Sequence, residues 1–442
     1  MDMGIALKSH VRQLLPERAL LAYHRVFARM AALAYHFPSH EMIVIGVTGT
    51  KGKTSTANYL WAALRATGAS VAQISTANIR INDTENINPF HMTMPGRFTL
   101  QRLMAQARRK GCTWCIVETT SEGIKQSRHA GIVYDIVVLT NLTPEHLRSH
   151  GGKFENYRDA KATIFRELAA SYRKAIDGRP VPKVIVVNAD SDQASHFLAF
   201  DADRKVTFSI RTASDIKAER VTTGSGGAKF SINDQSYTLS ILGAFNVYNA
   251  LPAIAIANVF DLPSDRVAAG LASLASIPGR MELINESQPF TVIVDYAHEK
   301  ESMTGALNAA RNVAGDAGRV IVLLGAEGGG RDTAKRGQMG KVAAEIADVV
   351  ITSNVDPYED DPFPIANDIA VAAEQHGKRR DHNLFVILDR REGIRKALSI
   401  AENGDVVLIT GKGAEQSITI GGKTMPWDDR VVVREEIEKL RR

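Results

Sequence analysis

The sequence predicts a soluble α/β protein with at least two parallel-sheet domains. Three observations carry this prediction. The chain has 442 residues, it is 44% hydrophobic and 23% charged, and short apolar runs alternate with longer amphipathic ones. A length of this order suits two or three domains, and strands that alternate with helices favour a parallel sheet. The segment GVTGTKGKTST, from Gly46 to Thr56, adds a glycine-rich turn between a predicted strand and a predicted helix.

The first half of the chain contains one series of predicted elements. Strands are expected at Met42–Val47, Trp114–Val117, Ile136–Thr140 and Val184–Asn188. Helices are expected between them at Ala57–Leu64, Leu100–Lys110 and Tyr157–Ala170. A stretch richer in β-strand follows over Val206–Leu242.

A turn at SIPGR, Ser276–Arg280, separates this series from a second one. The second series has predicted strands at Phe290–Asp295, Val320–Leu324, Val349–Thr352, Leu384–Leu388 and Val406–Thr410. We therefore place a domain boundary near residue 278. The expected domains are residues 41–277 and 278–442, preceded by a short basic helical segment over residues 1–40.

The N-terminal segment is basic and amphipathic. It contains Lys8, Arg12, Arg18, Arg25 and Arg29 against only Asp2 and Glu17, and its apolar residues recur at helical spacing, at Leu20, Tyr23, Phe27, Met30 and Ala34. Such a helix can lie on anionic lipid or pack on the next domain, and packing is the favoured interpretation. The segment has no clear apolar core with a cleavage site, so it is not predicted to be a signal peptide. No apolar run approaches the ~18 residues that a membrane span needs.

Charge and cysteine content narrow the class of protein. The net charge of +5 comes from 54 basic and 49 acidic residues, without a concentrated Lys/Arg block. This suits an anionic substrate and argues against nucleic acid. The two cysteines, Cys112 and Cys115, lack the two further ligands that a structural zinc site needs, so we expect them to be buried in a reducing cytoplasm.

The glycine-rich loop predicts a phosphate site. Its glycines allow backbone N–H groups to face an anion, Lys53 adds positive charge, and Thr54 stands where such loops place a hydroxyl on Mg²⁺. The spacing departs from GxxxxGK[ST], because Val47 occupies the position of the first glycine. Three residues downstream suit metal or phosphate chemistry: Glu118 at a strand end, His146 after the next strand, and Lys161. Each of them alone would also suit a solvated or structural position.

Seven motifs in order resemble one known family. They are GVTGTKGKTST, ETTSEG, TNLTPEHL with YRDAK, GAFNVYN, PGRMEL, VDYAH and GGGRDTAKRGQMG. This series over residues 42–415 resembles the Mur ligase superfamily, and QSR, DRREGI and GKGAE make it most similar to the tripeptide-synthetase (MurE) type. The resemblance implies a P-loop central domain with a parallel sheet and a C-terminal Rossmann-like α/β ligase domain.

The resemblance also implies roles for individual residues. The ATP-binding positions are Gly49, Thr50, Lys51, Gly52, Lys53, Thr54, Ser55, Asn246, Asn249 and Arg280. The catalytic positions are Lys53, Glu118, His146, Lys161, Arg280, Asp295 and His298, of which the last three complete the nucleotide site when the domains close. The metal positions are Thr54, Glu118, His146 and Lys161, with Lys161 carbamylated to N6-carboxylysine, because a carbamate is an anionic oxygen ligand where an ammonium would repel Mg²⁺.

Two further sets of positions are implied for the substrates. Thr93, Thr120, Ser121, Gln126 and Arg128 match the acceptor site, and Arg336, Asp356, Tyr358, Gly411 and Glu415 match the amino-acid site. The implied reaction uses ATP and Mg²⁺ in the cytoplasm. ATP phosphorylates a peptide carboxylate, and an amino acid then attacks the acyl phosphate to give an amide in a peptidoglycan precursor. Residues of both domains would position the groups and keep water away.

Four departures from the family pattern leave the substrates open. The N-terminal segment is shorter than the domain that holds the uridine diphosphate, so the acceptor is either held differently or is not a UDP-sugar. Tyr358 stands where diaminopimelate-adding members have Arg, so lysine, diaminopimelate and other amino acids stay open. Asp356 and Glu359 would favour a second amine over a carboxylate. Glu122 replaces a His near the acceptor, and Ala414 replaces a His beside the kept Glu415.

Other functions compete with this interpretation. A relative of the folylpolyglutamate, cyanophycin or pseudomurein-peptide type would use a non-UDP acceptor. An amidating relative that works with a glutaminase would usually carry a four-cysteine zinc ribbon, and this chain has two cysteines. A nucleotide-binding regulator without ligase activity would show degenerate motifs, whereas Lys53, Glu118 and Lys161 are all present.

Overall fold

A computed structural model describes residues 17–90, 92–145 and 147–441 of the chain. These residues form two compact units, which are described separately. The first unit comprises Met1–Ile216 and Pro252–Val267, and the second comprises Lys217–Leu251 and Ala268–Arg442. The predicted domain limits, with their boundary near residue 278, stay a prediction.

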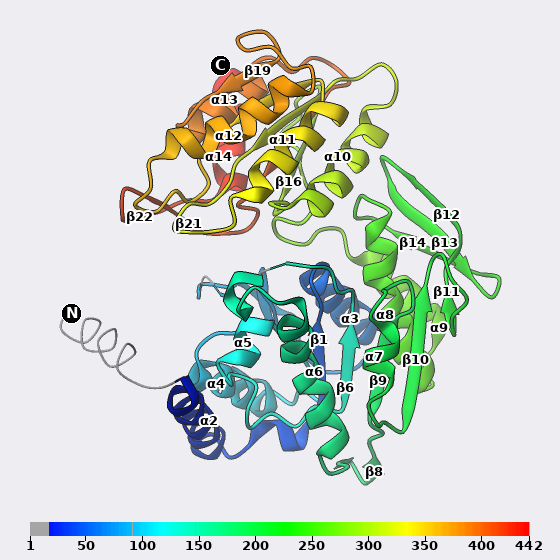
Figure 1. Ribbon diagram of the computed structural model, residues 1–442. Helices are drawn as coiled ribbons and strands as arrows, with labels where there is room; N and C mark the ends of the chain where they lie inside the picture. The colour runs from blue at the N-terminus through cyan, green and yellow to red at the C-terminus, as the bar shows by residue number, and fades with distance from the viewer. Residues whose placement is uncertain (1–16, 91, 146, 442) are drawn as a thin grey trace. The chain divides into compact units, whose positions relative to one another are not determined.

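A nine-stranded sheet forms the centre of the first unit, in the order β11-β10-β9-β6-β1-β5-β2-β3-β4. Figure 1 shows β10, β9, β6 and β1 side by side. Its strands are β1 (Ile43–Thr48), β2 (Val71–Ile74), β3 (Asn78–Ile81), β4 (Thr84–Ile87), β5 (Trp114–Glu118), β6 (Ile136–Leu139), β9 (Val184–Asn188), β10 (Arg204–Ser209) and β11 (Ile216–Lys217). The four strands predicted here are confirmed to within one residue, and Cys112 and Cys115 are confirmed as buried free cysteines.

The direction of the strands determines where the site lies. β1 pairs in parallel with both β5 and β6, with Gly46 beside Val117 on one side and Val137 on the other. The carboxyl ends of these three strands therefore meet at one edge of the sheet, where open α/β sheets bind ligands. The loop after β1, Glu118 at the end of β5 and the segment after β6 all emerge at this edge.

Helices pack on the sheet and enclose its core. The helices of the first unit are α2 (Glu17–Ala34), η1 (Pro38–Glu41), α3 (Lys53–Ala66), α4 (Arg97–Arg109), α5 (Ser121–Lys125), η2 (Leu147–His150), α6 (Phe154–Ala170) and α7 (Ala194–Leu198), with a small hairpin of β7 (Ala175–Ile176) and β8 (Arg179–Pro180). α3 packs on β1, β2 and β5, and α6 packs on β6. Strands such as Val184–Asn188 are wholly buried, which explains their continuous apolar sequence.

α2 agrees with the helix predicted for the N-terminal segment, whose residues 1–16, with Asp2, Lys8 and Arg12, lie outside the described residues. Of the apolar residues predicted to share one face, Leu20 and Phe27 are half-buried. The side chains of Tyr23 and Met30 are 48% and 50% exposed, whereas Ala28 and Ala32 are buried. Small side chains let the helix approach closely, since a Cβ on Gly131 would lie 2.7 Å from that of Ala32. The large apolar residues of the pattern therefore divide between the packed side and the exposed side of the helix, and the alanines that pack were not predicted.

The buried Lys174 connects the segment after α2 to the core of the first unit. Lys174 Nζ donates to Asp135 Oδ2 at 2.5 Å and to the carbonyl oxygens of Ser39, Met42 and Val133 at 2.7, 2.9 and 2.8 Å. The segment that follows α2 is therefore fixed to the sheet by a fully satisfied ammonium group.

The second unit contains a six-stranded sheet in the order β15-β16-β20-β17-β18-β19. Only the edge strand β15 runs antiparallel, so the predicted second series of parallel strands is confirmed. The strands are β15 (Glu282–Ile284), β16 (Thr291–Asp295), β17 (Val320–Leu324), β18 (Val349–Thr352), β19 (Leu384–Val386) and β20 (Val406–Thr410).

Helices and two smaller sheets complete the second unit. The helices beside the six-stranded sheet are α10 (Lys300–Ala314), α11 (Ala334–Ile346), α12 (Pro362–Gln375), α13 (Arg390–Ser399) and α14 (Asp429–Leu440). The smaller sheets are β12 (Glu219–Gly224), β13 (Gly227–Ile232) and β14 (Gln235–Leu239), and β21 (Ser417–Ile420) with β22 (Lys423–Pro426). α8 (Phe245–Val259) and α9 (Ser264–Ser273) lie where the chain passes between the two units. Within the described residues, none of the helices combines the length and apolar character that crossing a bilayer requires.

Candidate active site

The glycine-rich loop has a backbone conformation that requires glycine. Gly52 is left-handed, with φ of 79°, and directly precedes α3. Gly49 has φ of 148°, and a Cβ on it would lie 2.0 Å from the hydroxyl oxygen of Thr140. The loop thus delivers the N-terminus of a 14-residue helix to the edge of the sheet, which is a favourable place for a phosphate.

Lys53, the first residue of α3, turns back over this loop. Its Nζ donates to the carbonyl oxygens of Gly49 at 3.1 Å and Thr50 at 2.8 Å. The positive charge therefore sits within the turn that would surround an anion.

The segment after β6 fixes the loop from the other side. Thr50 N donates to the carbonyl oxygen of Asn141 at 3.0 Å, and Lys51 N donates to its side-chain oxygen at 2.9 Å. Thr140 donates its hydroxyl to the carbonyl oxygen of Lys51 at 2.6 Å, and the side chain of Lys51 forms an ion pair with Glu145. Sequence reasoning missed Asn141 and Glu145, although both lie in the quoted TNLTPEHL motif.

Thr54 and Glu118 meet beneath the loop. The hydroxyl of Thr54 donates to the two carboxylate oxygens of Glu118 at 3.1 and 3.0 Å, and Thr76 N donates to the same carboxylate at 2.7 Å. Glu118 is 2% exposed. Hard oxygen donors this close together suit Mg²⁺. In the part of the chain that the structure describes, no three His, Cys, Asp or Glu side chains form a metal cluster.

Lys161 on α6 reaches the same loop from below. Its Nζ donates to the carbonyl oxygen of Gly49 at 2.7 Å and lies 4.6 Å from the centre of the Tyr157 ring. Burial, and secondly the charge of Lys53, lower the pKa of Lys161 well below its ordinary value, although Glu145 raises it. A buried lysine with a lowered pKa has a reactive neutral amine.

His146 lies outside the described residues, and His150 is the histidine that the structure brings to the site. His150 Nε2 lies 3.2 Å from the hydroxyl of Ser121, and its ring meets the Tyr157 ring edge-on with centroids 5.2 Å apart. Burial is the main cause that lowers the pKa of His150. The stretch TNLTPEHLRSHGG contains both His146 and His150, and its sequence gives no means of choosing between them.

The predicted acceptor residues are held by hydrogen bonds to one another and to neighbouring residues. The hydroxyl of Thr120 accepts from Gly123 N at 3.1 Å and caps α5, while Thr93 and Thr76 share a hydroxyl contact of 2.8 Å. Arg128 donates to the side-chain oxygen of Gln126 at 2.8 Å and to the carbonyl oxygen of Met94. The structure thus places one guanidinium in a fixed orientation next to α5.

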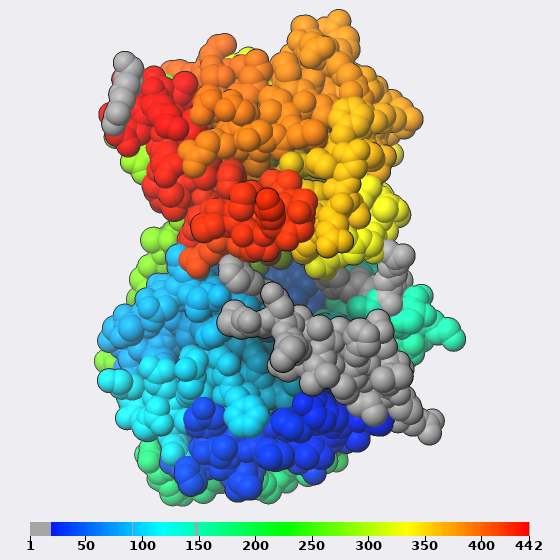
Figure 2. Space-filling view, turned by 90° about the vertical axis from the view of Figure 1, so that its left-hand side faces the viewer, coloured from blue at the N-terminus to red at the C-terminus, as the bar shows by residue number. Residues whose placement is uncertain are grey.

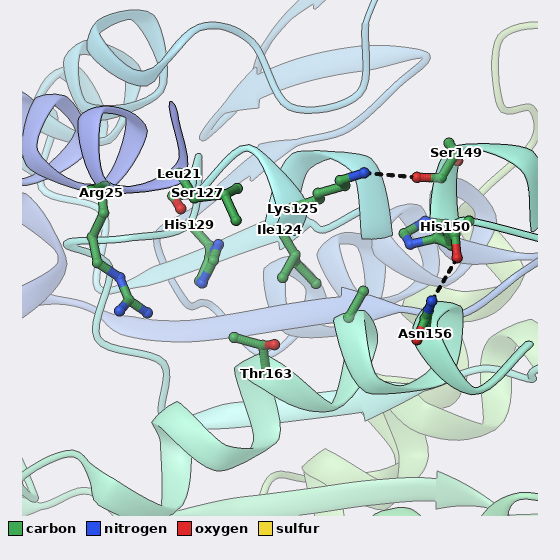
Figure 3. A pocket seen from close by; sticks show the side chains of 13 residues that line it. Leu21, Arg25, Ile124, Lys125, Ser127, His129, Ser149, His150, Asn156 and Thr163 are labelled. Atoms are coloured by element: carbon green, nitrogen blue, oxygen red, sulfur yellow. Dashed lines mark hydrogen bonds between the residues drawn. The ribbon is translucent and has the colours of Figure 1, made fainter. Parts of the chain in front are cut away.

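A pocket of about 920 Å³ borders α5 on the side of α2 and α6. Figure 3 shows Arg25 and His129 at one end and Lys125 and His150 at the other. Lys125 Nζ donates to the carbonyl oxygen of Ser149 at 3.0 Å. The pocket is lined by Arg25, Lys125 and two histidines. An acidic group lies next to this basic lining, since His129 Nε2 is 3.2 Å from the Glu167 carboxylate.

Two asparagines predicted near the adenine lie at the start of α8. Asn246 donates to the carbonyl oxygen of Leu242 at 2.7 Å, and Asn249 donates to Asn246 Oδ1 at 2.9 Å. Both side chains are buried. These contacts order the first turn of the helix.

In the second unit, a charged cluster lies at the carboxyl ends of the parallel strands. Asp295 ends β16, where it accepts from Met281 N at 2.8 Å and Ala297 N at 2.7 Å, and burial raises its pKa although Arg280 lowers it. The Arg280 guanidinium lies 4.2 Å from the centre of the Tyr296 ring. His298 Nδ1 lies 2.7 Å from the carbonyl oxygen of Tyr296. Tyr296 therefore contacts both Arg280 and His298, and sequence reasoning missed it.

Lys412 forms ion pairs with both acidic residues that were predicted to contact the amino acid, Asp356 and Glu415. Its Nζ donates to Asp356 and Glu415, at 2.6 Å in each case, and the Tyr296 hydroxyl donates to the other Glu415 oxygen at 3.0 Å. Glu415, and secondly burial, raise the pKa of Tyr296 far above its ordinary value. An incoming ammonium would share these carboxylates with Lys412. Tyr358 follows with φ of 57°, and its ring lies where a Cβ on Gly329 would approach within 2.8 Å.

Glu327 forms a second ion pair in this cluster. Its carboxylate lies 3.1 Å from Lys335 Nζ, which is also 3.4 Å from Glu299. Burial raises the pKa of Glu327, but Lys335, His298 and Arg331 together lower it to about 2. Arg336, predicted near the amino acid, donates to Asp368 of α12 at 2.9 Å.

Comparison with protein families gives two matches along the chain. Residues 47–257 match the Mur ligase middle domain, and residues 279–413 match the Mur ligase glutamate ligase domain. A UDP-N-acetylmuramoyl-L-alanyl-D-glutamate–2,6-diaminopimelate ligase from Geobacillus kaustophilus is 37% identical over 420 residues, which is 94% of this chain and 83% of that protein. A UDP-N-acetylmuramyl-tripeptide synthetase from a Roseiflexus species is 35% identical over 421 residues, covering 93% of this chain and 82% of that protein.

A solved structure gives the same result for the fold. The structure of a UDP-N-acetylmuramoyl-L-alanyl-D-glutamate–2,6-diaminopimelate ligase superposes with a TM-score of 0.61 at 27% sequence identity. The match covers 91% of this chain and 79% of the other. The predicted α/β fold is therefore confirmed.

Proposed function

The chain belongs to the Mur ligase family and is an ATP-dependent, ADP-forming ligase, and from this premise we propose that it adds one amino acid to a UDP-N-acetylmuramoyl-dipeptide. The relatives named above support this acceptor. The reaction would take place in the cytoplasm, consistent with the free cysteines.

The observation that carries the proposal is the convergence of three groups on one loop. Thr54 and Glu118 lie in contact below the loop, and Lys161 donates to the carbonyl oxygen of Gly49. Phosphoryl transfer needs positioning and neutralisation of charge more than covalent chemistry from the protein. The loop N–H groups and Lys53 would hold the β- and γ-phosphates of ATP, and Lys53 would exchange its loop carbonyls for phosphate oxygens.

Mg²⁺ fits the oxygen donors that the structure brings together. Thr54 and Glu118 would hold it through a hydroxyl and a carboxylate oxygen, and the ion would neutralise charge on the transferred phosphate. Lys161 as an ammonium would repel the ion. The neutral amine of Lys161 can add to carbon dioxide, forming an N–C bond and releasing one proton, and the carbamate that results is an anionic oxygen donor.

The reaction would proceed in two balanced steps. An oxygen of the acceptor carboxylate attacks the γ-phosphorus of ATP, and ADP leaves. The amino-acid nitrogen then attacks the acyl carbon, the bond to phosphate breaks, and the nitrogen loses a proton. Arg128, held by Gln126, would orient the acidic acceptor by a charged contact.

The residues of the second unit would serve the amino acid. Glu415 and Asp356 are candidates to bind its ammonium group. Lys412 donates to both carboxylates and so reduces their net negative charge. Asp356 already forms an ion pair with Lys412 and accepts a hydrogen bond from Thr419 N at 2.7 Å, so it offers less to a second amine than the sequence indicated. The prediction that Arg280, Asp295 and His298 complete the nucleotide site stays a prediction.

Phosphate release from ATP tests the proposal. Purified protein with Mg²⁺ is offered a matrix of acceptors, including UDP-N-acetylmuramoyl-L-alanyl-D-glutamate, and amines, including L-lysine and meso-diaminopimelate. We expect turnover that requires this acceptor and one amine, with the amide product visible by mass spectrometry. Turnover with another carboxylate alone would refute the acceptor and retain the ligase class.

A further inference from the structure

The helix α2 presents two opposite apolar faces, and only one of them is covered. Ala28, Ala31 and Ala32 are at most 1% exposed and form the packed face. α2 packs on α4 and lies against Gly131. The approach is so close that a Cβ added to Gly131 would lie 2.7 Å from Ala32 Cβ. The three alanines give a close contact, and Leu20, Leu21 and Phe27 are half-buried beside them.

The opposite face carries other large apolar residues in the open. Tyr23, Val26, Met30 and Leu33 are 48%, 54%, 50% and 62% exposed. At 100° per residue they form a stripe about 80° wide, centred on the side of the helix away from the alanines. Figure 2 shows the dark blue residues of α2 on the surface of the first unit. A continuous exposed apolar stripe of this kind marks an interaction surface, whereas single exposed apolar residues are ordinary.

Positive charge flanks the stripe on one side. Arg25 and Arg29 are both exposed, and the sequence from Ala19 to Ala34 contains no acidic residue. Glu167, on α6, lies 3.8 Å from Arg25 on the side of the pocket. The uncovered part of α2 therefore combines an apolar stripe with arginines along its border.

We propose that this face of α2 docks the protein on an anionic lipid bilayer. Aromatic and aliphatic side chains enter the boundary between headgroups and acyl chains, while arginines at the border contact lipid phosphates. Each Lys or Arg near such a surface adds to the attraction. The proposal goes beyond the ligase activity and needs no change in it, since none of these side chains belongs to the nucleotide site.

Charge and area favour lipid over a second copy of the chain. A two-fold dimer through this stripe would bring the same arginines of both copies to one interface, where like charges repel. Four large side chains on one helix are also few for a stable dimer, which needs about 1,200–2,000 Å² of buried surface. An anionic bilayer offers apolar depth and negative charge at once.

Vesicle flotation of the full chain tests the proposal. Vesicles of phosphatidylcholine are compared with vesicles in which about one-third of the lipid is phosphatidylglycerol, at low and at high salt. We expect binding to the anionic vesicles only, with weaker binding at high salt because the charge is screened.

Matched variants separate this face from the rest of the basic chain. Val26→Glu and Met30→Glu should lower the bound fraction at least roughly tenfold, because each places a carboxylate in the apolar stripe. Val431→Glu is the control, since Val431 is 50% exposed on α14. Arg29→Gln, which leaves the pocket residue Arg25 in place, should bind more weakly than the parent, and Lys229→Gln on β13 is its control. Amide formation by all these variants should equal that of the parent.

Three results would overturn the proposal. Equal binding by Met30→Glu and the parent would assign lipid contact to other basic residues. A dimer by light scattering that dissociates in Val26→Glu would assign the stripe to a second copy. Absence of binding to the anionic vesicles would show that another part of the chain or a protein partner covers α2.

Discussion

The amine of Lys161 donates to the carbonyl oxygen of Gly49 at 2.7 Å, from a fully buried position beneath the glycine-rich loop. The two residues are 112 positions apart in the sequence. The parallel order of β1 and β6 brings them together, because the loop after one strand and the helix after the other emerge at the same edge. The contact joins the phosphate loop to a reactive amine.

Replacing Lys161 by Ala should abolish turnover while ATP still binds. The substitution removes the amine that would carry the carbamate, and we expect the rate to fall by a factor on the order of 10² or more. Phosphate release gives the rate, and a fluorescent ATP analogue gives binding. Added formate or acetate should restore part of the activity by supplying the missing carboxylate. Lys153→Ala, an exposed change at the start of the same helix, should be neutral. Full activity in Lys161→Ala would remove this residue from the mechanism.

Glu118→Gln should separate charge from hydrogen bonding at the predicted metal site. The amide oxygen can still accept from Thr54 and Thr76, so the fold should be retained. The lost charge should raise the Mg²⁺ concentration needed for half-maximal rate by roughly tenfold. A Mg²⁺ titration of phosphate release measures this, with Glu155→Gln, an exposed change in the first turn of α6, as control. An unchanged Mg²⁺ dependence would exclude Glu118 as a ligand.

Two substitutions at His150 should distinguish its two contacts. His150→Phe keeps a ring against Tyr157 and removes the polar contact with Ser121, so the KM for the acceptor should rise about two- to tenfold with the KM for ATP unchanged. His150→Ala removes both contacts and should also raise the KM for ATP, because the Tyr157 hydroxyl lies 3.1 Å from that of Thr50 in the loop. Equal KM values for the acceptor in the parent and His150→Phe would show that the residue only fills space.

Glu327→Gln should lower stability in a pH-dependent manner. The pKa of Glu327 is about 2 in the folded protein and near 4.5 in the unfolded chain, so the unfolded state binds more protons between these values. The contribution is complete above pH 4.5 and disappears as the pH falls toward 2. We expect a loss of about 1–3 kcal/mol at pH 7 that shrinks in acid. Urea unfolding, followed with a fluorescent probe in the second unit, measures this change in the free energy of unfolding. Glu345→Gln, on an exposed helix face, should change little at any pH. A difference independent of pH would contradict the charge assignment.

The sequence predicted the parallel strands because they are buried on both faces and have continuous apolar runs, as in Val320–Leu324. It did not predict β2, β3 and β4, since these strands are four residues long and β4 is largely exposed. Short strands have few positions for a pattern, and their pairing is set by neighbours in space.

For the candidate site, motifs located the residues but not their partners. Thr54 and Glu118 are 64 positions apart, and only the strand order shows that they touch. Tyr296 and Glu327 escaped notice because an aromatic residue and a glutamate beside apolar strands have no distinctive spacing. The packed face of α2 was also missed, since alanine contributes little to a hydrophobic pattern although it allows the closest approach.

The oxygen cage around Lys174 gives the enzyme an internal counterpart of a structural cation. Three carbonyl oxygens and Asp135 surround the ammonium, as oxygen ligands would surround a bound ion. A side-chain cation cannot be extracted by a chelator. Treatment with EDTA should therefore stop turnover while the segment after α2 stays attached to the sheet. Stepwise addition of Mg²⁺ should then restore turnover without a refolding phase.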